Sequence, residues 1–573
     1  MKRFDNYITG HPGSPLTMVI AYVVALCVPN VVLCFTESMS WLAAITNVVL
    51  PMGVYLMILS LSVNAGKPIW WLFPAAFLGA FQIVLFFLYG GSIIGVDMFL
   101  NVLTTNSTEV GELLGNLFPA LVVVFVLYLP QLVWASINLA KKRLLHTLTR
   151  RRVCKAGLIC TTVGLLTLSA AYLSVPGYSI GRDLFPVNVV RNCVLSIQRV
   201  RQNANYPDTS RDFTFHAGSV HQADEPETYV VVIGETGRAD HYGVNGYSRN
   251  TTPFISSTDG LVVFSRVLSE SNTTHKSVPM LLSLVDARSF NDINRQKSII
   301  TAFREAGFFT AYLSTQPLNH SYIDYFGNEA DYVRFANANR SGLEVKRDEA
   351  LLPLLDSVLS SSTCRKRVVF LHTYGSHFSY SDRYGREFAQ FQPDNTNDAS
   401  AANRASLINA YDNSVVHTDY LLHRIIARLQ REHLASTAML YVCDHGEDIF
   451  DDSRRRFLHA SPTPTYWQLH VPMMVWTSKQ WQTSHPEQWQ RLRLRSEAQV
   501  SSSRSFAPLV LDVAGVTTPL SESGGSPAAV DYTEPERVYV SDLNECLPLT
   551  RCGLKQQDYQ HFTLKGITYQ SAL

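Results

Sequence analysis

Five long apolar segments in the first third of the chain place the tightest limit on how it folds. They cover about residues 15–35, 41–63, 70–90, 117–137 and 157–175. Each is about 20 residues long and nearly free of charge, which matches the ~30 Å hydrocarbon core of a bilayer. The first segment lacks a clear cleavage site and four more follow it, so we expect five membrane-spanning helices rather than a signal peptide.

Basic residues set the expected orientation of these helices. Lys and Arg precede the first segment, occur between the second and third, and concentrate between the fourth and fifth as Lys141, Lys142, Arg143, Arg150, Arg151, Arg152 and Lys155. The alternate connections contain acidic residues and no Lys or Arg. Because short basic loops stay in the cytoplasm, the chain after about residue 176 is predicted to lie outside it. Membrane topology accounts for the basic loop, so no nucleic-acid partner is expected.

The remaining sequence predicts a linker and a soluble domain after a transmembrane domain over 1–176. Prolines and amphipathic stretches over 177–225 indicate a periplasmic linker with helices on the membrane surface. Within 226–573, short apolar runs alternate with helical patterns; the runs are 230–233, 308–313, 368–371, 438–443, 473–476 and 538–540. This alternation predicts an α/β domain with a mostly parallel, doubly wound sheet.

Polar residues that can take part in catalysis or metal binding follow two of these runs. Glu235 comes directly after the first run and its closing Gly234, and Asp444-His445 follows the run 438–443. The carboxyl ends of strands are where α/β sheets bind their ligands. Between them lies Thr274, at the expected start of a helix, with Thr273 and Ser277 as alternative hydroxyls. A carboxylate, a hydroxyl and an Asp-His pair predict a metal-activated Thr nucleophile and transfer of a phosphoryl-type group.

Several separated motifs resemble those of the membrane-bound phosphoethanolamine transferases, a family that includes the lipid A modifiers behind polymyxin resistance. The family's opening signature is similar to Gly234–Pro253, its nucleophile segment to Thr274 with Ser277-Val278-Pro279, and its metal motif to Asp444–Glu447. The likeness extends to a loop after the third span (Asp97–Asn106 with Glu109) and to a central helix (Tyr411-Asp412-Asn413 with Thr418-Asp419).

The resemblance implies an alkaline-phosphatase/sulfatase-like fold that holds zinc through Glu235, Thr274, Asp444 and His445. It also implies that His377 and His459 contact the phosphate of the substrate or a second metal. The ligand set suits Zn²⁺ and also Mn²⁺. The implied enzyme lies in the bacterial inner membrane, with its catalytic domain in the periplasm. It transfers phosphoethanolamine from phosphatidylethanolamine to lipopolysaccharide, on lipid A or a core sugar, through a covalent intermediate on Thr274.

The chain also departs from that family. The lipid A enzymes usually flank the nucleophile with a disulfide-forming cysteine pair, and those positions are Glu270 and Met280 here, with Lys276 an unexpected cation nearby. The segment 471–478 with His485-Pro486 looks closer to relatives that modify the lipopolysaccharide core. The acceptor therefore stays open between lipid A, core heptose or Kdo, and a periplasmic glycan.

Two other activities of the same fold are alternatives, namely a phosphoglycerol transferase and a sulfatase-like hydrolase. Gly234-Glu235-Thr236 favours the ethanolamine group, and Thr274 argues against a hydrolase, which should present a formylglycine-type Cys or Ser. The presence of all the expected metal ligands argues against the non-enzyme alternative, a scaffold protein that kept the fold and lost activity. Three further expectations concern the surroundings: Cys546 and Cys552 are close enough to bridge a short loop, 451–456 forms an exposed charged loop, and Glu447 is solvated or behind the metal ligands.

Overall fold

A computed structural model of the chain describes residues 15–37, 39–89, 93–104, 107–222, 225–319, 321–337, 347–361, 364–396, 398–432 and 435–569. Lys2, Arg3 and Asn106 lie outside the described residues, and the side chain of Glu109 is not described. Two compact units divide the chain: residues 1–99 with 113–197, and residues 100–112 with 198–573. We describe each unit by itself.

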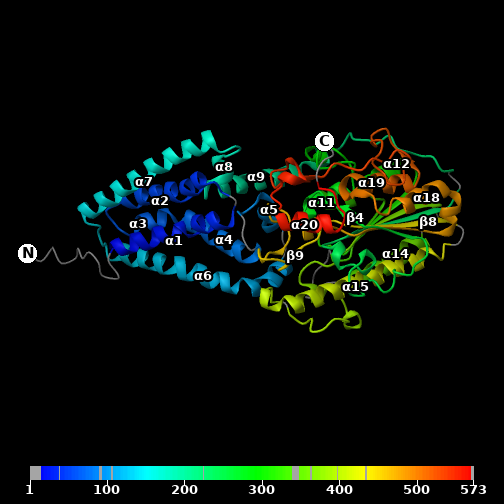
Figure 1. The fold of residues 1–573 in the computed structure, drawn as a ribbon, viewed down its shortest axis with the longest axis horizontal. Coiled ribbons are helices and arrows are strands. Elements are labelled where there is room, and N and C mark those ends of the chain that lie inside the picture. The colour runs from blue at the N-terminus through cyan, green and yellow to red at the C-terminus, as the bar shows by residue number, and fades with distance from the viewer. Residues whose placement is uncertain are drawn as a thin grey trace, which may run out of the picture. The chain divides into compact units, whose positions relative to one another are not determined.

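All five predicted apolar segments form helices. Four helices in the described part of the chain are long and apolar enough to cross a membrane, and the third segment forms the shorter apolar helix α4. The helices are α1 (Pro15–Thr36), α2 (Trp41–Ser60), α3 (Lys67–Trp71), α4 (Phe73–Tyr89), α5 (Val96–Thr104), α6 (Ser107–Ala140) and α7 (Thr147–Ser174). The N-terminal part is thus a helical transmembrane bundle, coloured blue to cyan in Figure 1.

Glycines bring two of these helices into close contact. A Cβ atom at Gly53 of α2 would lie 2.4 Å from the backbone nitrogen of Thr161, and one at Gly164 of α7 would lie 2.6 Å from Cα of Leu50. Small residues let helix backbones approach in an apolar environment, where dispersion contacts replace the hydrophobic effect as the force for association. The α2–α7 pair therefore depends on residues that lack side chains.

Short helices follow in the predicted linker region: α8 (Ile180–Asp183), α9 (Val187–Ala204) and α10 (Tyr206–Thr209). In α9, Val189, Asn192 and Ser196 are buried at helical spacing on one side. Val190, Val194 and Ile197, also at helical spacing, are exposed and form an apolar side of the helix. The contact of this region with a membrane surface stays a prediction.

A seven-stranded sheet forms the centre of the second unit, in the order β3-β11-β8-β2-β7-β5-β6. Its strands are β2 (Glu227–Gly234), β3 (Leu261–Phe264), β5 (Phe309–Ser314), β6 (Tyr332–Phe335), β7 (Lys366–His372), β8 (Ser436–Cys443) and β11 (Met473–Thr477). β8, β2, β7, β5 and β6 pair in parallel, and β11 is antiparallel to both of its neighbours. The prediction of a mostly parallel sheet is confirmed.

Helices cover both faces of this sheet, as a doubly wound arrangement requires (Figure 1). On one face lie α11 (Thr274–Leu281), α12 (Ile299–Glu305) and α19 (Ser502–Val513). On the other lie α14 (Leu351–Ser361) and the long α15 (Arg404–Leu429). The strands of the centre are buried along nearly their whole length because both faces are covered.

Smaller elements surround the sheet. The remaining helices are α13 (Tyr322–Gly327), α16 (Tyr466–Leu469), α17 (Lys479–Ser484), α18 (Pro486–Leu494) and α20 (Gln556–Leu564). Two-stranded pairs join β1 (Gly218–Ser219) with β13 (Val516–Thr517), β4 (Arg266–Leu268) with β12 (Gln499–Ser501), β9 (Asp448–Ile449) with β10 (Phe457–Leu458), and β14 (Val538–Val540) with β15 (Cys546–Pro548). The run 538–540 is therefore a strand, but outside the main sheet.

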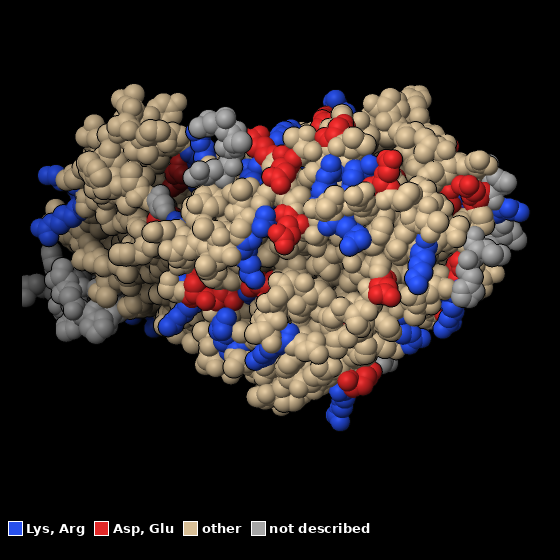
Figure 2. All heavy atoms as spheres, turned by 45° about the vertical axis from the view of Figure 1, so that its right-hand side comes forward, with Lys and Arg blue, Asp and Glu red and all other residues tan. Residues whose placement is uncertain are grey.

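On the face drawn in Figure 2, Lys and Arg alternate with Asp and Glu over the second unit. Interspersed charges of both signs are the usual surface of a water-soluble domain.

Candidate active site

Two neighbouring parallel strands bring the predicted site together. β2 and β8 pair in a register that sets Gly234 opposite Cys443. The next residue along each strand is Glu235 and Asp444, so both carboxylates leave the sheet at the same edge. The side chains of Glu235, Asp444 and His445 are buried. The sheet register alone accounts for the meeting of residues more than 200 positions apart in sequence.

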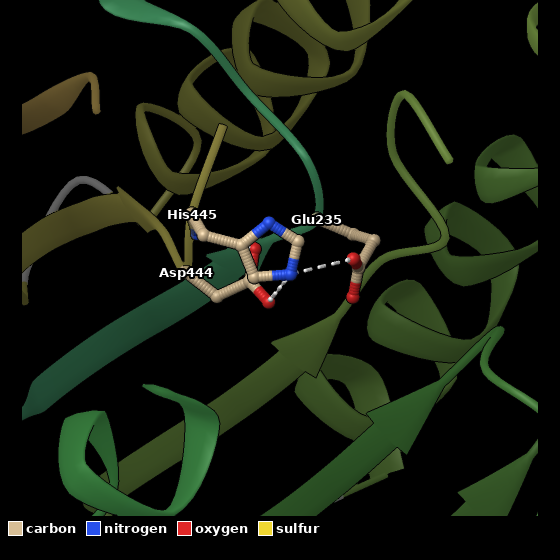
Figure 3. A group of neighbouring side chains, drawn as sticks. All are labelled: Glu235, Asp444 and His445. Carbon is tan, nitrogen blue, oxygen red and sulfur yellow. Dashed lines mark hydrogen bonds and ion pairs between the residues drawn. The ribbon is translucent and has the colours of Figure 1, made fainter. Parts of the chain in front are cut away.

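The three side chains point toward one another (Figure 3). One potential ligand atom from each lies within 4.8 Å of the others. Nε2 of His445 is 3.2 Å from Oδ2 of Asp444 and 3.6 Å from Oε1 of Glu235. Among the described residues this is the one group of three or more His, Cys, Asp or Glu side chains with metal-binding spacing.

Hydrogen bonds around the cluster leave lone pairs facing its centre. Nδ1 of His445 donates to the carbonyl oxygen of Gly446 at 2.9 Å, which leaves Nε2 as an acceptor. Asp444 accepts from the backbone N–H groups of Thr236 and His445 through Oδ1, while its buried Oδ2 has no hydrogen-bond partner. Buried acceptors that face one another are stabilised by a cation, and carboxylate oxygen with imidazole nitrogen suits zinc. The residues present therefore fit a metal ion.

The pKa shifts reflect the same crowding of buried charge. Burial, and then the neighbouring Asp444, raise the pKa of Glu235 to about 8. Burial raises the pKa of Asp444 to about 7 and lowers the pKa of His445. Each pKa shift reflects a free-energy cost for the charged form of its group in this buried site. A bound cation reverses this penalty for carboxylates, so the site is much better suited to a metal than to free ionised side chains.

Thr274 supplies the hydroxyl group at the cluster. It is the first residue of α11, and its Oγ1 lies 3.0 Å from Nε2 of His445 and 3.2 Å from Oε1 of Glu235. The other two candidate hydroxyls, of Thr273 and Ser277, contact Ser271 instead. The structure thus brings Thr274, rather than its neighbours, to the edge of the sheet.

Two residues for which the sequence predicted no role hold Glu235 in place. Thr236 has φ +59°, an uncommon left-handed conformation for a β-branched residue, and its hydroxyl donates to Oε1 of Glu235 at 2.8 Å. Gln316, just beyond β5, donates from Nε2 to Oε2 of Glu235 at 3.1 Å. Only the position of Gln316 after a predicted strand could have suggested it. Strained backbone persists where the surroundings over-determine it, as they do here.

The two predicted substrate histidines lie beside this cluster. The ring of His459 is 4.1 Å from that of His445 and 6.1 Å from that of His377, measured between centroids. Nδ1 of His459 is 3.5 Å from Oε2 of Glu447, and neither atom has a hydrogen-bond partner. Tyr380 donates to the other oxygen of this carboxylate. Glu447 is fully buried, so it is not the solvated residue that one expectation allowed.

The expectation of an exposed loop at 451–456 holds only for Ser453 and Arg455. The side chain of Asp451 is 5% exposed and pairs with Arg238 at 2.9 Å and with Arg404 at 3.1 Å. Arg454 pairs with Asp558 at 2.7 Å. These partners are distant in sequence, so the pattern of charges within 451–456 could not predict the ion pairs. Of the suggested disulfide partners, both Cys546 and Cys552 are free thiols in the structure.

Comparison with known proteins identifies the family. A model of the sulfatase family matches residues 227–516, about half of the chain. The chain therefore belongs to the sulfatase family.

Curated relatives give a narrower likeness. The phosphatidylethanolamine transferase Mcr-1 of Escherichia coli is 29% identical over 411 residues, which cover 68% of this chain and 75% of Mcr-1. The Kdo(2)-lipid A phosphoethanolamine 7''-transferase of Salmonella typhimurium is 29% identical over 330 residues, 56% of each chain. The resemblance to phosphoethanolamine transferases, inferred above from separated motifs, is confirmed.

Solved structures support the fold. The integral membrane lipooligosaccharide phosphoethanolamine transferase A (EptA) from Neisseria meningitidis matches with a TM-score of 0.69 at 21% identity, over 90% of this chain and 97% of that one. The periplasmic domain of EcEptC from Escherichia coli, in complex with Zn, matches with a TM-score of 0.52 at 22% identity, over 58% of this chain and 94% of that one. The transmembrane bundle with a sulfatase-like α/β domain is thus a known combination.

Proposed function

We propose that this protein transfers phosphoethanolamine from phosphatidylethanolamine to lipopolysaccharide, on lipid A or a core sugar, with Thr274 as a covalent nucleophile at a zinc site. The observation that carries the proposal is the position of the Thr274 hydroxyl, 3.0 and 3.2 Å from two acceptors of the buried cluster. The likeness to transferases named for phosphatidylethanolamine and for Kdo(2)-lipid A supports the choice of donor and acceptor.

The reaction proceeds in two displacements at phosphorus. In the first, Oγ1 of Thr274 bonds to the donor phosphorus, the bond from phosphorus to the diacylglycerol oxygen breaks, and the proton of the Thr hydroxyl ends on the released diacylglycerol. In the second, an acceptor hydroxyl bonds to phosphorus, the bond to Thr274 breaks, and the proton returns to Thr274. Splitting one transfer into two steps is the usual advantage of a covalent nucleophile.

Glu235, Asp444 and His445 would hold the metal, together with Thr274. When bound, zinc lowers the pKa of a coordinated hydroxyl and stabilises negative charge on the phosphoryl oxygens. The hydrogen bonds from Thr236 and Gln316 orient Glu235 toward the cluster. Such supporting contacts fix ligand geometry before substrate arrives.

His377 and His459 would bind the phosphate oxygens beside Thr274. Burial, followed by the neighbouring His445, His377 and His275, lowers the pKa of His459 well below its usual value. A neutral imidazole still carries one N–H that can donate to a phosphoryl oxygen. The group is therefore suited to positioning the donor phosphate and its leaving oxygen.

The proposed reaction requires the catalytic domain on the periplasmic side of the bacterial inner membrane, where both lipids would be within reach. The basic residues around the loop between α6 and α7, followed by α7 as one further spanning-length helix, support this orientation.

Mass spectrometry of lipopolysaccharide tests the proposed activity. Cells that express the protein should carry added phosphoethanolamine on lipid A or core, and cells with the Thr274→Ala variant at equal abundance should not. Fragmentation of the modified lipopolysaccharide identifies the acceptor. Added phosphoglycerol, or loss of sulfate or phosphate with no addition, would instead favour one of the two alternative activities.

A further inference from the structure

Two histidines meet at the other end of β2, remote from the candidate active site. His221 precedes β2 and His485 precedes α18, and their Nε2 atoms are 3.1 Å apart. Glu227, the first residue of β2, contacts His221, whereas Glu235 follows the last residue of that strand. The eight residue steps from Glu227 to Glu235, at about 3.3 Å each, separate the two places by about 26 Å. The proposed reaction makes no use of this pair.

Hydrogen bonds fix the tautomer of each ring. Nδ1 of His221 is 3.0 Å from Oε1 of Glu227, and Nδ1 of His485 is 3.1 Å from the carbonyl oxygen of Trp481. An ionised carboxylate and a carbonyl oxygen only accept hydrogen bonds, so both Nδ1 atoms must donate. Each neutral ring is then left with a lone pair on Nε2. The two lone pairs face one another at 3.1 Å, an arrangement that calls for a cation between them.

The ring geometry favours a metal ion over a shared proton. The ring centroids are 4.7 Å apart and the ring planes are inclined by 42°. A linear N–H···N bond of this length would hold the centroids about 5.4 Å apart, because each ring would lie on the bond axis. The observed 4.7 Å shows that the rings are bent away from that axis, so a proton shared by the two nitrogens would lie in a bent and therefore weakened hydrogen bond. Two zinc ligands at bond lengths of about 2 Å and near-tetrahedral angles lie about 3.3 Å apart, close to the 3.1 Å between the Nε2 atoms here.

The surroundings hold the pair in this arrangement. Lys366 donates to the carbonyl oxygen of His221 at 3.0 Å and lies 3.6 Å from Oε1 of Glu227, so it balances the charge of that carboxylate. A Cβ atom at Gly515 would lie 2.4 Å from Nε2 of His221, and the φ of this glycine is +62°. The site therefore has an oriented histidine with a carboxylate behind it, as metal-binding histidines usually have.

We propose that His221 and His485 form a second metal site, for a divalent transition ion of the class that imidazole binds, such as Zn²⁺, Ni²⁺ or Cu²⁺. Among the described residues no third His, Cys, Asp or Glu completes a three-ligand group here, so the remaining ligands would have to come from solvent. The bound ion joins the segment that enters β2 to the start of α18. Its role is structural, and it is independent of the proposed transferase activity.

Metal stoichiometry of the full-length protein in detergent tests this proposal. The protein is stripped with chelator and titrated with Zn²⁺ by calorimetry, in the His445→Ala background to remove the catalytic cluster. The parent should bind one ion per chain, and His221→Gln or His485→Gln should bind none. His216→Asn, at an exposed histidine in the same segment, is the matched control and should bind one ion.

A spectroscopic measurement guards against loss through misfolding. Cu²⁺ bound to the His445→Ala parent should show electron paramagnetic resonance coupling to two imidazole nitrogens, and His485→Gln should reduce this to one or lose the ion. In the chain with His445 intact, His485→Gln should leave transfer activity unchanged, which shows that it folds. Zn²⁺ stoichiometry that is the same in His485→Gln as in its parent, or a parent without bound metal, would overturn the proposal.

Discussion

Glu270 provides a sharp test of how the segment before the nucleophile is held. This carboxylate is 2% exposed. It accepts hydrogen bonds from the Ser501 hydroxyl at 2.6 Å and from the backbone N–H of Ala287 at 2.8 Å. Its backbone oxygen accepts from Val540. Where the resembling family has a cysteine of a disulfide, this chain uses hydrogen bonds to a buried carboxylate to fix the approach to α11.

We predict that Glu270→Gln stabilises the protein at alkaline pH. Burial, and then the nearby Asp286, raise the pKa of Glu270 from 4.5 to about 7. Because the folded state binds the proton more tightly than the unfolded state, stability falls as pH rises through this window. The loss is about 1.4 kcal/mol at pH 5.5 and about 3 kcal/mol above pH 7. Gln has the same shape, keeps an acceptor for Ala287 and can donate to Ser501, but carries no charge.

The assay is urea unfolding of the full-length protein in detergent, followed by tryptophan fluorescence at pH 5.5 and pH 8. The difference in unfolding free energy between Glu270→Gln and the wild type should grow by about 2 kcal/mol in favour of the variant between the two pH values. Glu522→Gln, at a side chain that is 77% exposed, is the control and should show no such trend. A difference that stays constant with pH, or that shrinks, would refute the account of this buried carboxylate.

Three further predictions concern the site and the membrane. Thr236→Val removes the hydroxyl that donates to Glu235 and should weaken metal binding about 10- to 100-fold, with Thr236→Ser close to the wild type, as measured by competition with a chelator. His445→Ala should lose the catalytic metal, whereas His459→Ala should keep the metal and lose turnover. Metal content and transfer activity are measured on both variants, and loss of metal from both would make His459 a metal ligand. A reporter fused after residue 225 should be active outside the cytoplasm and one within 141–155 should not, and the reverse pattern would contradict the proposed periplasmic catalytic domain.

Much of the fold could be predicted because its signals are local. Apolar length predicts the membrane helices, and the runs that become β2, β7 and β8 are continuous because both faces of the sheet are covered. The edge strands β3 and β6 were not predicted. Each is four residues long and only partly buried, so neither has the apolar run of a central strand. The antiparallel direction of β11 was also beyond a local pattern.

The site was predictable to the extent that its residues follow strands. Glu235 and Asp444 could be assigned to one edge from sequence because parallel strands end together. Gln316 and Tyr380 were not found, since a single amide or phenol carries no signal until the fold sets it against a carboxylate. The burial of Asp451 depends on Arg238, more than 200 residues away. Such long-range pairs are properties of the tertiary structure rather than of any motif.

The most direct test of the proposed mechanism is to measure the mass of the protein after incubation with its donor lipid. Purified protein incubated with phosphatidylethanolamine and no acceptor should gain the mass of one phosphoethanolamine on the peptide that contains Thr274, and should release diacylglycerol. Thr274→Ala should do neither, and chelation should prevent both in the wild type. An adduct on Thr273 or Ser277, or full transfer by Thr274→Ala, would contradict the account.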